Sequence, residues 1–202
     1  MDGGLGTMEA PAHAAPAAGS ALRADYARYL RIARADNGGL RAHVEALLEF
    51  GFLAIAVYRF GRWTRRLPRV VGLPFKLVHR VLDLASRMAF GIYISGHSDI
   101  GPGFYIGHFG GICVHADLGA NCSIAQGVTL GSKGAGKSAG VPRLGNNVYL
   151  GAGAMVIGAV QIGDDVVVGA NTVVVQDVPA GSRVVSAPAR ILPPPNPQGA
   201  RE

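Results

Sequence analysis

The feature that most constrains this sequence is an aliphatic residue that recurs every six positions between residues 94 and 174. After the seventh member the phase shifts by eight residues, and the period then resumes for six more. The members are Ile94, Ile100, Ile106, Ile112, Leu118, Ile124, Leu130, Leu144, Leu150, Val156, Ile162, Val168 and Val174. A period of six matches neither the 3.6-residue turn of a helix nor the two-residue alternation of a strand, so it indicates a repeat architecture.

The residues between these aliphatic positions predict the shape of one repeat. The next residue is usually glycine, and the side chain four positions on is mostly small or β-branched, with Phe104 as the exception. A short strand followed by a tight turn makes one side of a triangular prism, so three such units make one coil of about eighteen residues. We therefore predict a left-handed parallel β-helix of about five coils, with the aliphatic residues inside and glycine at corners that need a positive φ or lack room for a Cβ.

A helical domain is predicted ahead of the repeats. Apolar residues recur at helical spacing over residues 22–35, 40–63 and 73–90, with Gly51 weakening the middle of the second helix. The Ala-, Pro- and Gly-rich start (1–20) and the Pro-rich end (193–202) are expected to be disordered. The predicted organisation is a tail, a helical domain at 21–90, a mainly β domain at 91–192 and a second tail.

Charge and cysteine content narrow the classes of partner. The net charge of +6 comes from the first half, where eight basic residues and one acid lie between Arg59 and Arg87. This basic stretch fits a solvated helical face, or contact with anionic lipid or an anionic substrate. Nucleic acid is not expected as a partner, because few aromatic residues accompany the charges.

Cys113 and Cys122 are expected to be buried thiols in a reducing compartment. No apolar stretch approaches the roughly 20 residues that a bilayer requires, and the start lacks the pattern of a secretory signal, so we expect a cytoplasmic protein, with peripheral contact at the inner face of the membrane left open.

Several runs resemble the serine acetyltransferase branch of the hexapeptide acyltransferases. They are YIGHFGGICV (105–114), SIAQGVTLG (123–131), the Gly-rich loop at 132–143, GNNVYLGAGAMVIG (145–158) and SAPARI (186–191), with a weaker match in FLAIAVYRFGRW. The resemblance covers about residues 90–192. It implies a homotrimer with active sites between adjacent prisms, acetyl-CoA as the donor, a hydroxyl group as the acceptor and no metal.

The resemblance also implies roles for individual residues. His108 matches the general base, with backbone N–H groups at the coil corners available for the developing oxyanion. Ala152 and Ala170 match positions that contact the pantetheine arm, and Gly131 and Ser132 are further candidates. The cations available for the phosphates of coenzyme A are Lys133, Lys137, Arg183 and Arg190.

Three positions expected at the acceptor site depart from the serine enzymes. Tyr93 replaces an aspartate that orients the base, Gly107 replaces an aspartate that holds serine, and Gly140–Val141 replaces an Arg–His pair that grips serine. Without these charges a site has little to hold a small zwitterion, so the sequence favours a sugar or polysaccharide precursor as the acceptor. The His108 ring would then be oriented by a backbone carbonyl, by Tyr93 or by a neighbouring subunit.

Other functions remain open at this point. Serine O-acetylation is the first alternative, and a non-catalytic trimeric scaffold is a more remote one. A zinc enzyme on the same prism would need His97, His108 and His115 to converge on one metal.

Overall fold

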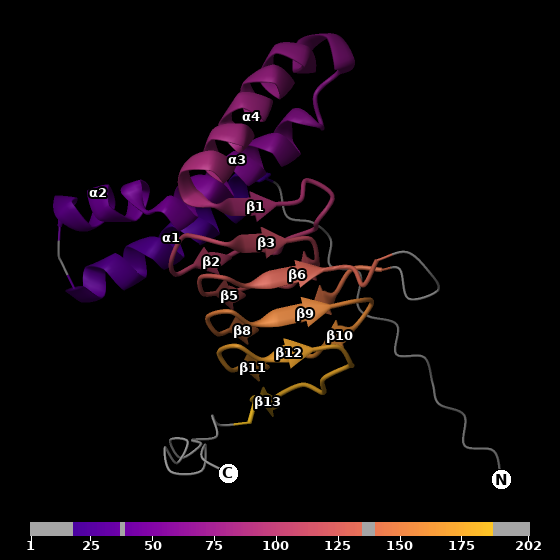
Figure 1. The fold of residues 1–202 in the computed structure, drawn as a ribbon. Coiled ribbons are helices and arrows are strands. Elements are labelled where there is room, and N and C mark those ends of the chain that lie inside the picture. The colour runs from indigo at the N-terminus through magenta and orange to yellow at the C-terminus, as the bar shows by residue number, and fades with distance from the viewer. Residues whose placement is uncertain (1–17, 37–38, 135–139, 188–202) are drawn as a thin grey trace, which may run out of the picture.

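The structure is a computed structural model that describes residues 18–36, 39–134 and 140–187. Within these residues, four helices precede the strands: α1 (Ala18–Asp36), α2 (Leu40–Leu48), α3 (Phe50–Thr64) and α4 (Arg69–Phe90). They sit at one end of a stack of flat coils (Figure 1). None of the described helices is both long enough and apolar enough to cross a bilayer.

The single helix predicted over residues 40–63 is wrong, because the chain leaves helical geometry at Glu49 (φ −59°, ψ 123°) and starts a new helix at Phe50. Gly51 is not the break. It lies inside α3, where a Cβ would come within 2.4 Å of the Ile106 carbonyl oxygen. The glycine therefore allows α3 to lie directly on the first coil.

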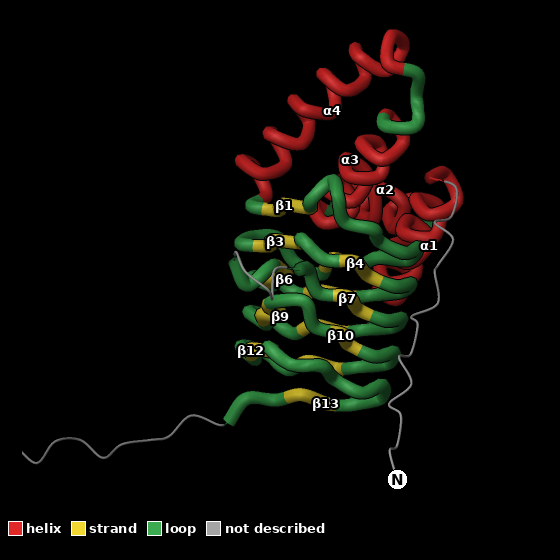
Figure 2. Tube along the Cα trace, turned by 90° about the vertical axis from the view of Figure 1, so that its right-hand side faces the viewer, coloured by secondary structure: helices red, strands yellow, loops and turns green. Residues whose placement is uncertain are grey.

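In the described part of the chain, thirteen short strands form three parallel sheets, one for each side of a prism (Figure 2). Sheet A contains β1 (Ile92–Ile94), β3 (Ile112–Val114), β6 (Thr129–Gly131), β9 (Met155–Ile157) and β12 (Val173–Val174). Sheet B contains β4 (Asp117–Leu118), β7 (Arg143–Leu144) and β10 (Gln161–Ile162). Sheet C contains β2 (Tyr105–Ile106), β5 (Ser123–Ile124), β8 (Tyr149–Leu150), β11 (Val167–Val168) and β13 (Arg183–Val184). The predicted left-handed β-helix behind a helical domain is confirmed.

The interior of the prism is an aliphatic stack, as the period predicts. All thirteen periodic residues are buried, with at most 7% of their surface exposed. In sheet C the register places Ile106, Ile124, Leu150 and Val168 directly above one another. Phe104, the one large residue in a position otherwise held by small ones, is also fully buried.

One element of the predicted register is wrong. Ile112 was expected to lie in phase with Leu130, but the residue that pairs with Leu130 is Val114. Val114 also pairs with Ile94, 20 residues earlier, whereas the next coil returns to Leu130 after only 16. The turn after β2 therefore holds two extra residues, and it is the turn that carries His108.

Most glycines that follow the aliphatic positions are kept for space rather than for a left-handed backbone, whereas Gly107 and Gly131 have room for a Cβ. A Cβ on Gly101 would lie 2.5 Å from the Gly119 carbonyl carbon in the coil below. Left-handed φ values at the corners fall instead on residues such as Asn121 (φ 58°) and Gly127 (φ 69°). Of the two reasons expected for the repeated glycines, contact between stacked corners applies at Gly101, Gly119, Gly145, Gly151 and Gly163.

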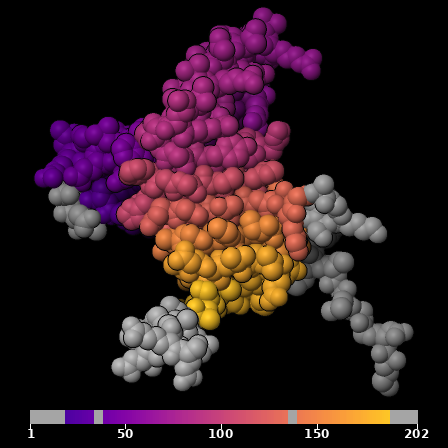
Figure 3. Space-filling view, in the orientation of Figure 1, coloured from indigo at the N-terminus to yellow at the C-terminus, as the bar shows by residue number. Residues whose placement is uncertain are grey.

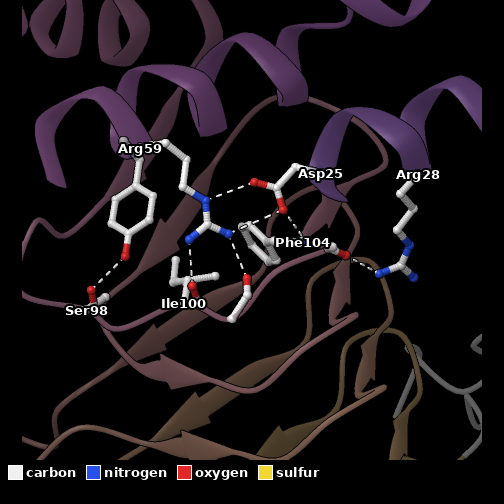
Figure 4. Close-up of polar contacts among 9 residues, drawn as sticks. Asp25, Arg28, Arg59, Ser98, Ile100 and Phe104 are labelled. Carbon is white, nitrogen blue, oxygen red and sulfur yellow. Dashed lines mark hydrogen bonds and ion pairs between the residues drawn. The ribbon is translucent and has the colours of Figure 1, made fainter. Parts of the chain in front are cut away.

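Polar side chains fasten the helices to the first coils. The Tyr29 hydroxyl donates to the Ile106 carbonyl oxygen at 2.9 Å, and the Tyr58 hydroxyl donates to the Ser98 carbonyl oxygen at 2.8 Å. Arg28 reaches the Gly103 carbonyl oxygen at 2.5 Å (Figure 4). The helical domain and the β-helix thus share one continuous core.

Candidate functional site

His108 lies on the prism corner between sheets C and A, which we call the base edge (residues 107–108, 125–126, 151–152 and 169–170). Backbone hydrogen bonds stack these turns: Gly153 N donates to the Gln126 carbonyl oxygen at 2.9 Å, and Asn171 N donates to the Ala152 carbonyl oxygen at 2.8 Å. The same edge therefore carries the predicted base His108 and the predicted cofactor positions Ala152 and Ala170.

The turn that carries His108 projects from this edge because of its two extra residues. Gly110 (φ 100°) and Gly111 (φ 65°) supply the left-handed backbone that this longer turn needs. His108 is exposed, and within the part of the chain that the structure describes its ring makes no hydrogen bond. The imidazole is thus available to an incoming group.

An aromatic cluster that the sequence analysis missed lies beside the base. Phe109 is 55% exposed, and its ring meets the edge of Phe50 at a centroid distance of 5.0 Å. Phe50 in turn stacks on Phe90 at 4.8 Å. The spacing of eight residues between Ile106 and Val114 was the available sign of this projecting turn, but nothing in the sequence joins Phe50 to it.

The predicted residues around the long loop lie on a different corner, between sheets A and B, which we call the loop edge (residues 131–133 and 140–141). A Cβ on Gly131 would meet nothing within 4 Å, and Ser132 and Lys133 are exposed. Val141 is half-buried just before β7. Lys137 and Arg190 lie outside the described residues.

Two further predicted residues lie on sheet faces rather than on either edge. Arg183 points outward from sheet C, where it pairs in register with Val167. Tyr93 points outward from sheet A, and the Arg87 guanidinium lies over its ring at 4.4 Å. Sheet A separates the base edge from the loop edge, so one chain alone does not bring the predicted site residues together.

The histidines considered for zinc do not share a corner. His108 is on the base edge, whereas His97 and His115 follow β1 and β3 on the opposite side of sheet A. In the described ranges no three His, Cys, Asp or Glu side chains are grouped as a metal site would require.

The two thiols differ in burial. Cys122 is 1% exposed, and burial raises the pKa of its thiol to about 11. Cys113 is only half-buried on the outer face of sheet A, which differs from the expected full burial, and desolvation still raises its pKa. Neither thiol is activated as a nucleophile would be.

Comparison with known proteins agrees with this architecture. The family model described as bacterial transferase hexapeptide (six repeats) matches residues 142–176. A serine acetyltransferase of Synechococcus elongatus is 38% identical over 147 residues, which cover 69% of this chain and 54% of that protein.

Solved structures that resemble this chain are also serine acetyltransferases. Serine acetyltransferase of Brucella abortus in complex with coenzyme A superposes with a TM-score of 0.68 at 29% identity, over 85% of this chain and 66% of that one. Soybean serine acetyltransferase complexed with serine gives a TM-score of 0.67 at 30% identity, over 85% and 70%.

The chain spans about half the length of the curated relatives it matches. The repeat, the base edge and these similarities nevertheless agree with one another. The chain belongs to the hexapeptide-repeat acyltransferases, in their serine acetyltransferase-like branch.

Proposed function

We propose that this chain is an acetyl-CoA-dependent O-acetyltransferase with His108 as its general base. The imidazole takes the proton of the acceptor hydroxyl as the oxygen attacks the thioester carbonyl carbon. The tetrahedral intermediate then collapses, the carbon–sulfur bond breaks and the imidazolium returns the proton to the departing thiolate. The products are an acetyl ester and free coenzyme A. The observation that carries the proposal is the exposed His108 on a corner it shares with Ala152 and Ala170.

The base edge suits an extended pantetheine arm. Ala152 and Ala170 stack in successive coils beyond Gln126, so this part of the edge carries only small side chains. Backbone amide groups can contact such an arm where side chains are small. Lys133 on the loop edge is exposed and can meet a phosphate group.

A homotrimer is supported by the division of the site over two edges. In a closed ring the base edge of one copy can face the loop edge of the next, which gives three equivalent grooves. Each groove then holds His108 from one subunit and Ser132 and Lys133 from another. A group from the neighbouring copy would also orient the His108 ring, which has no hydrogen bond within its own described chain.

L-serine is the first acceptor to consider. The relatives are named serine acetyltransferases, and the soybean enzyme is complexed with serine. None of these comparisons supports the sugar or polysaccharide acceptor expected from the sequence, so the alternative becomes the leading proposal.

A sugar hydroxyl is the second candidate because of the groups around the base. Gly107 and Val141 bring no charge, and the exposed Phe109 ring lies next to His108. An apolar ring offers a flat surface to a sugar face, whereas it offers nothing to a carboxylate or an ammonium group.

The test is release of coenzyme A thiol from acetyl-CoA in the presence of L-serine, sugars or nucleotide sugars. His108→Gln should lower kcat at least about a hundredfold while acetyl-CoA still binds. His97→Gln is the matched control and should keep its activity, which also tests the zinc alternative. A chain that neither binds acetyl-CoA nor turns over any acceptor is a scaffold, and that result would reject the proposal.

The expected cytoplasmic location remains part of the proposal, whereas contact with a membrane does not. The comparisons give no support to membrane contact. A bilayer is therefore only a competing occupant for apolar surface that the fold leaves exposed.

A further inference from the structure

Helix α4 turns its apolar side away from the rest of the chain. Six of its large hydrophobic residues are between 58% and 88% exposed, and we call them the outer face of α4: Val70, Leu73, Leu77, Val81, Leu84 and Met88. They recur at i+3 and i+4 spacing along one side of the helix. In the space-filling view α4 rises from the stacked coils with one side uncovered by the other described elements (Figure 3).

The side of α4 that packs inward carries small and polar residues as well as Phe75 and Phe90. The His79 ring covers Gly61 of α3 so closely that a Cβ there would come within 2.1 Å of its Nε2 atom. Gly72 and Ser86 are buried, and Arg87 lies over Tyr93 of β1. The helix cannot turn its apolar side inward without losing these contacts, so the exposure of the outer face is built into the fold.

The apolar surface continues down sheet A. Its outward residues stand in one register as an uncharged ladder: Tyr93, Cys113, Thr129, Met155 and Val173. Sheet B has Asp117, Arg143 and Gln161 in the equivalent ladder. Figures 1 and 2 agree that α4 meets the prism on the side of sheet A. The outer face of α4 and the ladder of sheet A are therefore neighbouring apolar surfaces, and the Arg87 guanidinium lies over Tyr93 where they meet.

The position of the candidate site indicates which part of the assembly covers this surface. Sheet A lies between the base edge and the loop edge. If the base edge of each copy faces the loop edge of the next, threefold symmetry turns the face between these edges toward the axis. We propose that the outer faces of three α4 helices, one from each copy of this chain, pack together around that axis above the ladders of sheet A. The proposal rests on the proposed function, because the shared site fixes which face is central.

The expected gain is large enough to hold an assembly. Burial of a large apolar side chain between copies is favourable in proportion to the apolar area that it removes from water. Each subunit offers six such largely exposed side chains on α4 alone. The helices would thus stabilise the grooves that contain the reaction, without touching a substrate themselves.

The test compares the mass in solution of the wild-type chain with that of Leu77→Glu and Val81→Glu. The wild type should have three times the 20.8 kDa of one chain, and each variant should raise the dissociation constant of the trimer at least about tenfold. Leu40→Glu is the matched control, because Leu40 is 81% exposed on α2, and it should remain trimeric. Circular dichroism checks that all variants keep their helices.

A second variant keeps the test decisive if the acidic variants aggregate. Val81→Cys should form covalent dimers between copies under mild oxidation, whereas Leu40→Cys should not. A trimer that survives both Glu variants, with no cross-link between copies of the Val81→Cys variant, overturns the inference and leaves the O-acetyltransferase proposal intact.

Activity separates failure of this inference from failure of the proposed function. A Glu variant that becomes monomeric and keeps full activity supports the helix contact but rejects a site shared between subunits. The helix contact is rejected if the wild type is a monomer that sediments with phosphatidylglycerol vesicles and the Leu77→Glu and Val81→Glu variants do not. The outer face of α4 would then bind a bilayer.

Discussion

Asp25 and Arg59 form an ion pair in which both side chains are buried. The Arg59 Nε donates to Asp25 Oδ2 at 2.9 Å, and Asp25 has no exposed surface (Figure 4). Asp25 Oδ1 also accepts from the Phe104 amide at 2.8 Å, while Arg59 donates to the Ile100 carbonyl oxygen at 2.6 Å. Burial raises the pKa of Asp25 against the opposing pull of Arg59. The pair thus joins α1, α3 and the first coil.

Removing one member of this pair should strongly destabilise the fold. Arg59→Met leaves a buried carboxylate without its partner, which costs about 3–5 kcal/mol. The free energy of unfolding, measured by urea titration, should fall by that amount. The first coil should also lose amide protection from hydrogen exchange, because fewer contacts then hold the helices that cover it.

The surface pair between Arg41 and Glu45 is the control for this prediction. It has the same 2.9 Å separation but lies on an exposed helix face, so Arg41→Ala should cost no more than about 1 kcal/mol. Equal losses in Arg59→Met and Arg41→Ala would show that the buried pair contributes no special stability.

High pH should weaken the fold through Cys122. Its thiol has a pKa of about 11 in the folded chain against 9.0 for an unperturbed thiol. Between these values the unfolded chain gives up the proton and the folded chain does not, so stability falls as pH rises, by about 2–3 kcal/mol in total. Burial raises the pKa of Tyr29, Tyr58 and Tyr105 as well, which acts in the same direction.

Urea midpoints at pH 7.5, 9 and 10.5 check this expectation. Cys122→Ala should show a shallower decline than the wild type across that range. Cys113→Ala should change the decline less, because that thiol is only half-buried. A wild-type decline that Cys122→Ala leaves unaltered would assign the alkaline sensitivity to the tyrosines alone.

The period of the aliphatic residues was enough to predict the prism, because each buried aliphatic residue lies above the equivalent residue of the next coil. Its failure at Ile112 has the same origin. The turn that carries His108 is two residues longer than the equivalent turns, and the segment between Val114 and Leu118 is two residues shorter. The six-residue period therefore continues at Leu118, although the residue that pairs with Leu130 is Val114. A period reports the total length of a coil and not where within it a turn is longer.

No pattern in the sequence comparable to the six-residue period predicted the contacts between the helical domain and the prism. Asp25 and Arg59 are 34 residues apart and show no period, and the Phe50–Phe109 contact joins a helix start to a turn. The break at Glu49 also had no signal in the sequence, because Leu48 and Glu49 favour a helix and the weak helix former nearby, Gly51, lies inside α3. His108 was found because its neighbours resemble a family, whereas its surroundings depend on tertiary packing.

The base edge should bind acetyl-CoA less well when a larger side chain fills it. Ala170→Leu places a branched side chain on an exposed corner, so folding should be unaffected while KM for acetyl-CoA rises at least about tenfold. Ala180→Leu makes the same change on the corner between sheets B and C and should leave KM unaltered. Isothermal titration with coenzyme A reports the binding directly, and equal affinity in both variants would place the arm elsewhere.

A substitution at Gly107 tests whether the acceptor site lacks a negative charge that would bind serine. The matching position in serine acetyltransferases is an aspartate by the resemblance described above, and the structure has room for one. A Cβ on Gly107 would meet the Tyr105 ring at 3.4 Å and the Ile124 carbonyl oxygen at 3.8 Å, both ordinary contacts, and its φ is not left-handed. Gly107→Asp should therefore fold normally. A carboxylate that binds an ammonium group contributes about 1.5–3 kcal/mol, so KM for L-serine should fall at least about tenfold.

Gly107→Asn fills the same space without charge, so it should leave KM for L-serine near the wild-type value. Gly101→Asp tests the structural argument, because its Cβ would lie 2.5 Å from the Gly119 backbone, and it should unfold at a lower temperature than Gly107→Asp. If Gly107→Asp leaves KM for serine unchanged but abolishes turnover with a sugar, then the wild-type site is shaped for a neutral acceptor. The uncharged corner beside His108 would in that case be the determinant of specificity, and serine would not be the acceptor.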